Sequence, residues 1–534
     1  MSRTTPPGLL GLLALLALAV PAGAAQPSTG ALPQALPPAG AHAARAALVP
    51  ARWLVAARAT PRARRIAGRH GARALRLPGT FSVPAPRARA LARDLRRAGL
   101  LRYSEADAPL ARLSTFEAPG SDPTWTRGTM VAAGLTPPAA FAPIGVIDDV
   151  VDAAVADVAQ ARVLSASPNR TLDPNGGAET AHGTEVASVA AGRADGQGVI
   201  GIAPGAPLLS FGLKTLSCAE VVDGVLDLAD AGAKVINLSV ETEEDCHTLQ
   251  LAIASAFGDG AVVVASAGNA GEKGDPTTYP AVYPHVMTVG ALDVGLAPAS
   301  FSTAGAGVDI AAPGDAVPVA VPAGLDRDGT PDGLTRATGT SFAAPIVSGL
   351  ASWLVAARPG LTAGQYGDLL RAGAQDVGAA GWDDRTGFGR ADLAAALKAP
   401  APVSDRGEPD DGIDFVDGSA FTRPDPYVSG TIKASVAPVE DPADVYRIRI
   451  KARGRAAVTL RPRGDADLYA YTGRAKSLAA TPVARSRRTG AATDAVTLRN
   501  RTSRAATFYV AVRVPRGTDR TVAGQAYSLK IARR

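Results

Sequence analysis

The sequence predicts an α/β protein whose central domain is a doubly wound, mostly parallel sheet. From Ala142 to Lys398, short apolar runs such as PIGVID, KVINLSV and AVVVASAG alternate with helix-like segments such as GTEVASVAAG. The apolar runs are continuous and rich in β-branched residues, as in strands buried on both faces of a parallel sheet. The chain has 534 residues, of which 46% are hydrophobic and 19% charged, so it is long enough for two or three domains with large cores.

Smaller domains are expected on either side of this sheet. Residues 51–107 alternate strand-like and helix-like segments, from RWLVAAR to LLRYSEA, and predict a small α+β module. Residues 117–139 are expected to form a loop or junction. Residues 399–425 are rich in Pro, Asp and Gly and are interpreted as a linker. From residue 426 to 534, polar and apolar residues alternate between turn residues, which is typical of a β-sandwich.

The first 25 residues have the features of a secretory signal peptide. Arg3 supplies the positive charge, Leu9 to Val20 the apolar segment, and Ala22-Gly23-Ala24 the small-residue cleavage site. A membrane anchor is the alternative, but the apolar run is shorter than the roughly 20 residues that span a bilayer. Residues 26–48 are rich in Ala, Pro and Gly and are expected to be flexible. We therefore expect a secreted protein without stable membrane insertion.

Charge changes sign along the chain although the total is only +6. The formal charge is +12 for residues 26–119, −17 for residues 120–398 and +10 for residues 399–534. This pattern does not indicate nucleic-acid binding by the whole chain, whereas opposite charges on neighbouring segments can guide their docking. The excess of arginine over lysine, 47 to 8, leaves a genomic compositional bias open as an alternative.

The cysteine content allows one disulfide. Cys218 and Cys246 are the two cysteines of the chain, and in an exported protein such a pair suggests a disulfide. Two free thiols are the alternative. A zinc site would need more ligands than the nearby His247 supplies.

Polar residues that could perform nucleophilic catalysis interrupt the α/β region at strand ends and helix starts. Asp148 ends PIGVID, His182 begins HGTEVAS, and Ser341 lies in RATGTSFAAPIVSG. A serine becomes nucleophilic when a histidine accepts its proton and a carboxylate orients the histidine. Asn269 follows the apolar run VVVASAG and could donate its amide to an oxyanion. Each residue alone also has a structural interpretation, as a cap or a turn residue.

The segments GVIDD, HGTEVAS, VINLSV, ASAGN and GTSFAAP, in this order, resemble those of the subtilisin-like serine proteases, or subtilases. The resemblance extends from Ala142 to Leu397. It implies that Ser341 is the nucleophile, His182 the general base and acid, and Asp148 the orienting carboxylate. It also implies an oxyanion hole formed by Asn269 and the backbone N–H of Ser341. The family chemistry requires no cofactor.

The same resemblance assigns residues to substrate binding. The set comprises the substrate-pairing strand Leu238-Ser239-Val240 and the pocket wall Ser266-Ala267-Gly268. Three positions depart from the family pattern. Asp149 follows Asp148, but adjacent strand residues face opposite ways, so it is expected to point away. Glu241 replaces a usual glycine and is expected to alter the cleft and favour basic substrate residues. Ile346 replaces a common histidine and is expected to be tolerated.

The flanking domains also resemble parts of subtilase precursors. The module at 51–107 resembles a peptidase inhibitor-like pro-domain within a pro-region at 26–119, which would inhibit the catalytic domain at 120–398. Self-cleavage is expected between about Ala106 and Asp122. The C-terminal segment resembles the pre-peptidase C-terminal β-sandwich of secreted bacterial proteases.

The sequence therefore predicts a secreted serine endopeptidase that acts on proteins or peptides as a monomer and is made as an autoprocessed zymogen. The alternative is a catalytically silent binding protein with the same fold, and processing of one dedicated partner is also compatible with these residues. Calcium is common in the family as a structural ion. Asp326, Asp328 and Asp332 offer oxygen ligands at calcium-like spacing, with a solvated turn as the other interpretation.

Overall fold

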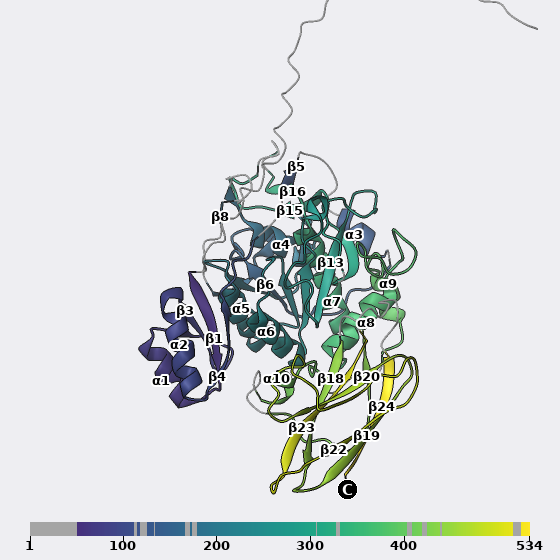
Figure 1. Ribbon diagram of the computed structural model, residues 1–534. Helices are drawn as coiled ribbons and strands as arrows, with labels where there is room; N and C mark the ends of the chain where they lie inside the picture. Colours follow the sequence, from purple (N-terminus) through teal and green to yellow (C-terminus); the bar gives the residue numbers. More distant parts are fainter. Residues whose placement is uncertain are drawn as a thin grey trace, which may run out of the picture. The chain divides into compact units, whose positions relative to one another are not determined.

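The computed structural model describes most of the chain from residue 51 onward (Figure 1). The described residues are 51–111, 115–117, 125–132, 134–165, 171–172, 179–305, 307–326, 330, 332–402, 408–418, 424–437, 441–515 and 525–533. The expected signal peptide, the segment at 26–48 and Asp328 lie outside them. The expected boundary between residues 119 and 120 also lies outside them.

The first part of the fold is a small antiparallel sheet with the strand order β2-β3-β1-β4 (Figure 1, purple). Its helices are amphipathic, with Leu91 and Leu95 fully buried on the inner side and arginines on the outer side. Thr60 caps the first helix by accepting a hydrogen bond from the Ala63 N–H. The elements are β1 (Arg52–Ala57), α1 (Pro61–Arg69), β2 (Arg73–Ala74), β3 (Thr80–Pro84), α2 (Ala85–Arg97) and β4 (Leu101–Ala106).

The central sheet is parallel throughout and has the strand order β14-β13-β12-β11-β6-β10-β7, which confirms the predicted doubly wound architecture. The strand of this sheet that comes first in the chain, β6, lies inside the sheet, with β10 on one side and β11 on the other. This is the switch point where α/β proteins bind ligands, and Asp148 ends β6 there. The strands are β6 (Ile144–Asp148), β7 (Arg162–Ser165), β10 (Leu208–Gly212), β11 (Val235–Leu238), β12 (Val262–Ser266), β13 (Val286–Leu292) and β14 (Val308–Pro313).

Helices cover both faces of this sheet because alternate strand residues point to opposite sides. Val146 packs with α4 and α7 on one face, whereas Ile147 packs with α5 and α6 on the other. This is why the strands have no polar alternation in the sequence. The helices are α4 (His182–Ala191), α5 (Cys218–Asp230), α6 (His247–Gly258), α7 (Thr340–Ala357), α8 (Ala363–Gly373) and α9 (Leu393–Lys398). Among the described residues, α7 is long and apolar enough to span a membrane, but 83% of it is buried, as in the core helix of a globular domain.

The C-terminal part consists of two antiparallel sheets with the orders β17-β24-β19-β22 and β18-β23-β20-β21. Their facing apolar residues form a shared core, as in the predicted β-sandwich. The strands are β17 (Gly430–Val436), β18 (Ala443–Ile450), β19 (Arg455–Pro462), β20 (Asp467–Thr472), β21 (Ala484–Ser486), β22 (Asp494–Arg499), β23 (Ala506–Arg513) and β24 (Gln525–Arg533).

Two segments expected to lack regular structure contain some. The expected junction at 117–139 overlaps the end of β5 and includes α3, and the expected linker includes α10, whose Ile413, Phe415 and Val416 are buried. These elements were missed because each is too short to show a periodic pattern. The remaining elements are β5 (Thr115–Glu117), α3 (Trp125–Met130), η1 (Ala156–Val158), β8 (Thr171–Leu172), β9 (Glu179–Thr180), η2 (Gly271–Lys273), β15 (Val317–Ala320), β16 (Leu334–Thr338) and α10 (Ile413–Val416).

Candidate active site

A buried carboxylate and imidazole meet at the carboxyl end of β6. The Asp148 Oδ2 lies 2.8 Å from the His182 Nδ1, and the two side chains are 0% and 1% exposed. The Asp149 N–H also donates to the Asp148 Oδ1 at 2.8 Å, which holds the carboxylate in one orientation. A carboxylate on Nδ1 makes Nε2 the ring nitrogen that accepts or releases a proton during catalysis.

Gly183 allows the helix that carries His182 to approach β6. A Cβ atom at this position would lie 2.1 Å from the Asp149 carbonyl oxygen and 3.2 Å from the Asp148 Cβ. Any side chain there would therefore push α4 away from the strand. His182 begins α4, and its ring also packs against the Phe342 ring in a T-shaped arrangement, with the ring centroids 5.5 Å apart. Since Phe342 follows Ser341, this contact brings the imidazole against the start of α7.

Ser341 lies in the first turn of α7 and is tied to the substrate-pairing strand predicted from the sequence. Pro345 has no N–H, so the helix cannot supply the usual donor to the Ser341 carbonyl oxygen. The Ser239 hydroxyl donates to that oxygen instead, at 2.9 Å, and the Ser341 Oγ donates to the Ser239 carbonyl oxygen at 3.4 Å. Asn237 donates to the Ser239 Oγ at 2.9 Å. This buried network fixes the candidate nucleophile relative to the end of β11.

Asn269 is anchored by its amide oxygen. The Thr340 N–H and hydroxyl donate to the Asn269 Oδ1 at 2.9 and 2.8 Å. Because Oδ1 accepts these bonds, Nδ2 is the donor end of the amide, which is the kind of group that stabilises an oxyanion. The expected oxyanion-hole residue is therefore held beside the residue that precedes Ser341.

The residues expected to bind substrate lie near these groups and are largely buried. Leu238, Ser239, Val240, Ser266 and Ala267 are each at most 3% exposed. The Thr278 hydroxyl donates to the Ala267 carbonyl oxygen at 2.7 Å and braces that wall. Gly268 has a φ of +107°, a conformation that favours glycine.

Glu241 places a carboxylate against this wall. A Cβ atom at Gly268 would lie 2.3 Å from the Glu241 Oε2, which is buried and accepts no hydrogen bond. Burial raises the pKa of Glu241 to about 7, nearby Glu243 adds to the rise, and the Asn269 backbone N–H opposes it. The carboxylate thus changes its charge near neutral pH beside the predicted specificity pocket.

A further acid beside His182 was missed from the sequence. Glu185 lies on α4, three residues after His182, and is 1% exposed. Burial raises the pKa of Glu185 to about 7, with His182 opposing the rise and Asp148 and Asp149 adding to it. Asp149 is itself fully buried. The sequence did hold one indication of this buried acid, because Glu185 is the one acidic residue in the segment HGTEVASVAAG, whose other residues after the histidine are small or apolar.

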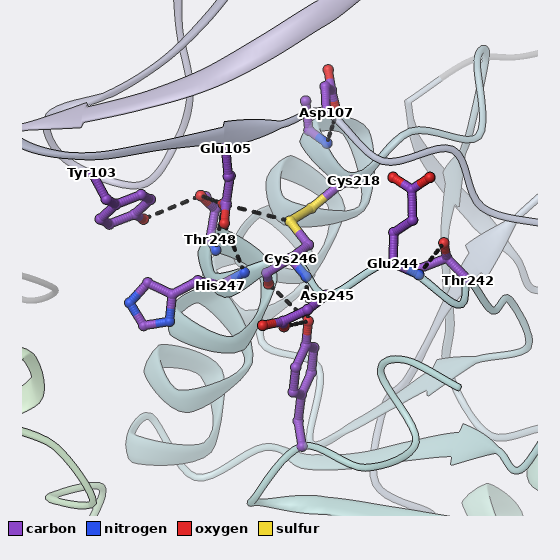
Figure 2. The surroundings of a disulfide bond; sticks show 12 residues. Tyr103, Glu105, Asp107, Cys218, Thr242, Glu244, Asp245, Cys246, His247 and Thr248 are labelled. Carbon is purple, nitrogen blue, oxygen red and sulfur yellow. Dashed lines mark hydrogen bonds between the residues drawn. A yellow bond between two sulfur atoms is a disulfide. The ribbon is translucent and has the colours of Figure 1, made fainter. Parts of the chain in front are cut away.

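Residues of the N-terminal module cap two helices of the central domain (Figure 2). The Glu105 carboxylate accepts hydrogen bonds from the N–H groups of His247 and Thr248 at 3.1 and 2.9 Å, at the start of α6. The Asp107 Oδ1 accepts one from Ala219 at 2.9 Å, at the start of α5. Carboxylates are favoured at helix N-termini, where backbone N–H groups lack partners within the helix.

The disulfide between Cys218 and Cys246 joins the starts of the same two helices (Figure 2). The Cα atoms are 6.7 Å apart. The bond therefore holds together the two N-termini that Glu105 and Asp107 cap.

The charge complementarity expected from the sequence occurs at the margin of this contact. The Arg73 Nη1 lies 2.6 Å from an Asp223 oxygen, and the Arg76 Nε lies 2.7 Å from an Asp227 oxygen. Arg76 also pairs with Asp230. The centre of the contact is apolar, because Leu54 on β1 packs in one core with residues of α5 and α6. Arginine pairs along α5 thus accompany an apolar and helix-capping contact.

The chain after β4 runs beside the segment that is expected from the sequence to pair with substrate. The Leu110 N–H donates to the Leu216 carbonyl oxygen at 2.7 Å, and Ala111 exchanges backbone hydrogen bonds of 2.7 and 2.9 Å with Glu241. The bridge between Ala111 and Glu241 is antiparallel. Further along, β5 pairs with β16, the strand that leads into Ser341. One pairing therefore lies two residues from Ser239, which bonds to Ser341, and the other lies on the strand that precedes Ser341.

The calcium-like cluster expected from the sequence is described only in part. The Asp326 Oδ2 accepts a hydrogen bond from Gly333 at 2.8 Å, and the Asp332 Oδ1 accepts one from Leu334 at 3.0 Å. Both carboxylates therefore accept hydrogen bonds from backbone N–H groups of the local turn and stabilise it.

Comparison with known proteins identifies relatives of the central domain. A family model described as the subtilase family matches residues 142–389. Subtilisin DY of Bacillus licheniformis is 34% identical over 246 residues, which are 44% of this chain and 84% of that protein. Fervidolysin of Fervidobacterium pennivorans is 34% identical over 245 residues, which are 42% of this chain but only 35% of that protein.

The crystal structure of fervidolysin, described as a keratinolytic enzyme related to subtilisin, has a similar fold over most of this chain. It superimposes with a TM-score of 0.56 and 17% sequence identity, and the match covers 87% of this chain and 92% of the solved one. At this identity the likeness shows the fold alone. The match to subtilisin DY, in contrast, is specific and covers most of that relative. The chain therefore belongs to the subtilase family.

Proposed function

We propose that this protein is a secreted serine endopeptidase with Asp148, His182 and Ser341 as its catalytic triad. The observation that carries the proposal is the 2.8 Å bond between the buried Asp148 and His182, with the histidine packed against the start of the helix that presents Ser341. A relative that is 35% identical over 220 residues, from Natrialba magadii, is described as an extracellular serine protease, which supports export.

The proposed reaction uses protein side chains alone. Ser341 Oγ attacks the carbonyl carbon of the scissile peptide while His182 Nε2 takes its proton. The negative oxygen that forms is stabilised by the Ser341 backbone N–H and the Asn269 Nδ2. His182 then gives the proton to the leaving amine, and water releases the acyl group by the same steps in reverse. Asp148 keeps the imidazole oriented and stabilises its charged form.

Extended protein segments are the proposed substrates. Glu241 uses its backbone N–H and C=O to pair with Ala111, and a substrate strand would use the same groups after this segment leaves. Backbone pairing gives affinity that tolerates many sequences, while the wall at Ser266, Ala267 and Gly268 selects the side chain.

We further propose that the N-terminal module inhibits the enzyme until the chain cleaves itself between Ala111 and Thr115. The segments on either side of the proposed cleavage site support this proposal. Ala111, before the site, pairs with Glu241, and β5, after the site, pairs with β16, the strand that leads to Ser341. The sequence predicts this cleavage between about Ala106 and Asp122, and the two pairings support a position between Ala111 and Thr115 within that range. Capping of α5 and α6 by Asp107 and Glu105 would retain the released module.

The test compares the full chain without residues 1–25 with its Ser341→Ala variant. We expect the parent to react with a fluorophosphonate, to cleave casein and to lose an N-terminal fragment whose mass places the cut between Ala111 and Thr115. Ser341→Ala should stay intact and unlabelled, whereas a matched Ser300→Ala control, at an exposed serine, should behave like the parent.

The outcomes separate the alternatives. Absence of labelling and cleavage in the parent would favour a catalytically silent binding protein. Labelling without casein cleavage would favour processing of one dedicated partner. A cut outside residues 111–115 in an active enzyme would refute the proposed maturation site while leaving the triad in place.

A further inference from the structure

Glu241 reaches across the space in which the proposed enzyme would hold a substrate side chain. Its backbone N–H and C=O exchange hydrogen bonds of 2.9 and 2.7 Å with Ala111, so its backbone belongs to the segment expected to pair with substrate. Its carboxylate lies at Gly268, because a Cβ atom there would be 2.3 Å from the Glu241 Oε2. The side chain therefore extends from the pairing segment to the expected pocket wall of Ser266, Ala267 and Gly268.

The position of Gly268 indicates which substrate residue this carboxylate would meet. The Gly268 N–H donates to the Thr340 Oγ1 at 3.2 Å, and its carbonyl oxygen accepts from the Thr303 N–H at 2.9 Å, so this glycine is held beside the start of α7. Gly268 directly precedes Asn269, the proposed donor to the carbonyl oxygen under attack. A substrate side chain that contacts this wall therefore belongs to the residue whose carbonyl carbon is attacked, which is the residue before the scissile bond.

One oxygen of the Glu241 carboxylate has no hydrogen-bond partner among the residues that the structure describes. Glu241 is 9% exposed, and its Oε2 is buried and unpaired. The two threonines nearest a Cβ atom at Gly268 make other hydrogen bonds. The Thr278 hydroxyl donates to a backbone carbonyl oxygen at 2.7 Å, and the Thr303 Oγ1 accepts from a backbone N–H at 2.9 Å. A buried carboxylate oxygen without a donor is rare in folded proteins and requires an explanation.

Nearby charged groups do not balance the Glu241 carboxylate. Burial raises its pKa to about 7 and Glu243, on the same segment, raises it further, whereas the Asn269 backbone N–H and Lys273 on η2 oppose the rise. Glu243 and Lys273 are both exposed, so solvent and salt screen their effect. A positive group inside the pocket would be buried together with the carboxylate and would favour its charged form.

We propose that the enzyme selects lysine or arginine as the residue before the scissile bond, with the Glu241 carboxylate binding the cationic end. The proposal rests on the endopeptidase function proposed above. Lysine and arginine combine an apolar stem, which can pack between the pairing segment and the wall, with donors that reach the carboxylate. A hydrogen bond between charged groups in such a site favours the basic substrate by about 10- to 100-fold.

The test measures kcat/KM for p-nitroanilide peptides of the form succinyl-Ala-Ala-Pro-X, in which X is lysine, norleucine or alanine. Norleucine has the apolar stem of lysine without the ammonium group, so the ratio of these two values isolates the charge. The enzyme is the full chain without residues 1–25, after self-cleavage. We expect kcat/KM for the lysine peptide to exceed that for the norleucine peptide at least tenfold, mainly through a lower KM.

Variants assign the preference to one carboxylate. Glu241→Gln keeps the shape of the side chain and removes its charge, so the lysine-to-norleucine ratio should fall at least tenfold. Glu241→Gly, which introduces the residue usual in the family, should lower the ratio in the same way. Glu244→Gln removes the same charge from an exposed residue of the same segment and should keep the ratio of the parent. Fluorophosphonate labelling of each variant checks that Ser341 is still reactive.

The pH profile of the parent gives a second readout that needs no variant. Lysine stays charged between about pH 6 and 8, whereas Glu241, with a pKa of about 7, ionises in this window. The lysine-to-norleucine ratio should therefore rise with pH. Titration of His182 changes both values by the same factor and cancels in the ratio. In Glu241→Gln the ratio should not depend on pH.

The outcomes that would overturn the proposal are distinguishable from one another. A labelled parent that does not prefer lysine over norleucine, or a preference that Glu241→Gln leaves unchanged, would show that Glu241 does not bind the cation. A preference for alanine over both longer residues would show that Glu241 fills the pocket. Each of these results would leave the proposed triad in place. Absence of fluorophosphonate labelling in the parent would instead refute the proposed function, and the specificity with it.

Discussion

Replacing Glu185 by glutamine should remove a pH-dependent loss of stability. Burial raises the pKa of this carboxyl from 4.5 to about 7. Between these two pH values the unfolded chain releases a proton that the native state retains, so the free energy of unfolding falls as pH rises through this window. A difference of about 2.5 pKa units corresponds to about 3 kcal/mol, lost between about pH 4.5 and 7. Glutamine does not ionise, so this contribution should vanish in Glu185→Gln.

The measurement is urea unfolding at pH 4.5 and pH 8 in the Ser341→Ala background, followed by tryptophan fluorescence. Trp353 is 1% exposed on α7 and reports the core that α4 shares. The glutamine amide can leave a buried donor unpaired, but that cost of about 1–3 kcal/mol is the same at both pH values and cancels in the difference. Glu272→Gln, at an exposed glutamate, is the control. An unchanged pH dependence in Glu185→Gln would refute the assignment of a buried, proton-retaining carboxyl.

Three further predictions concern the triad, the disulfide and the N-terminal module. Asp148→Asn should lower kcat by about 10⁴-fold with little change in KM in a peptide hydrolysis assay, because the imidazole loses its orienting carboxylate; a loss below tenfold would contradict the proposed role. The pair Cys218→Ser and Cys246→Ser should lower the free energy of unfolding by about 3.6 kcal/mol in urea titrations, and reduction of the parent should have the same effect. Arg76→Ala should weaken inhibition by the released module less than tenfold at low salt, because its pair with Asp227 is solvent-exposed. At 1 M salt the effect should not be measurable, because salt screens the pair. A large effect at high salt would show that the contact of Arg76 depends on more than its charge.

The candidate site was predictable where chemistry and local pattern coincide. Asp148, His182 and Ser341 follow apolar runs or begin helices, and the order of their motifs resembles one family. The structure bonds Asp148 to His182 and ties Ser341 to Ser239. Glu185 escaped notice because a glutamate within a helix is ordinarily exposed, and only the packing of α4 shows that it is buried.

Charge patterning predicted the docking of the N-terminal module only in part. The basic segment and acidic body do form pairs, such as Arg73 with Asp223. The capping contacts, however, use acids of the module, Glu105 and Asp107, against helix N-termini. Net charge cannot show these contacts because a helix terminus attracts a carboxylate through its backbone N–H groups, which are the same in every sequence.

The sequence by itself determined the doubly wound sheet, the β-sandwich and the residues capable of triad chemistry, because periodicity and motif order are local properties of the chain. Only the tertiary structure decided which carboxylates are buried together. Glu185 lies beside Asp148, and Glu408 and Asp410 lie against Asp444, over separations of tens of residues. Burial and mutual repulsion depend on distances in space, and the local sequence does not contain those distances.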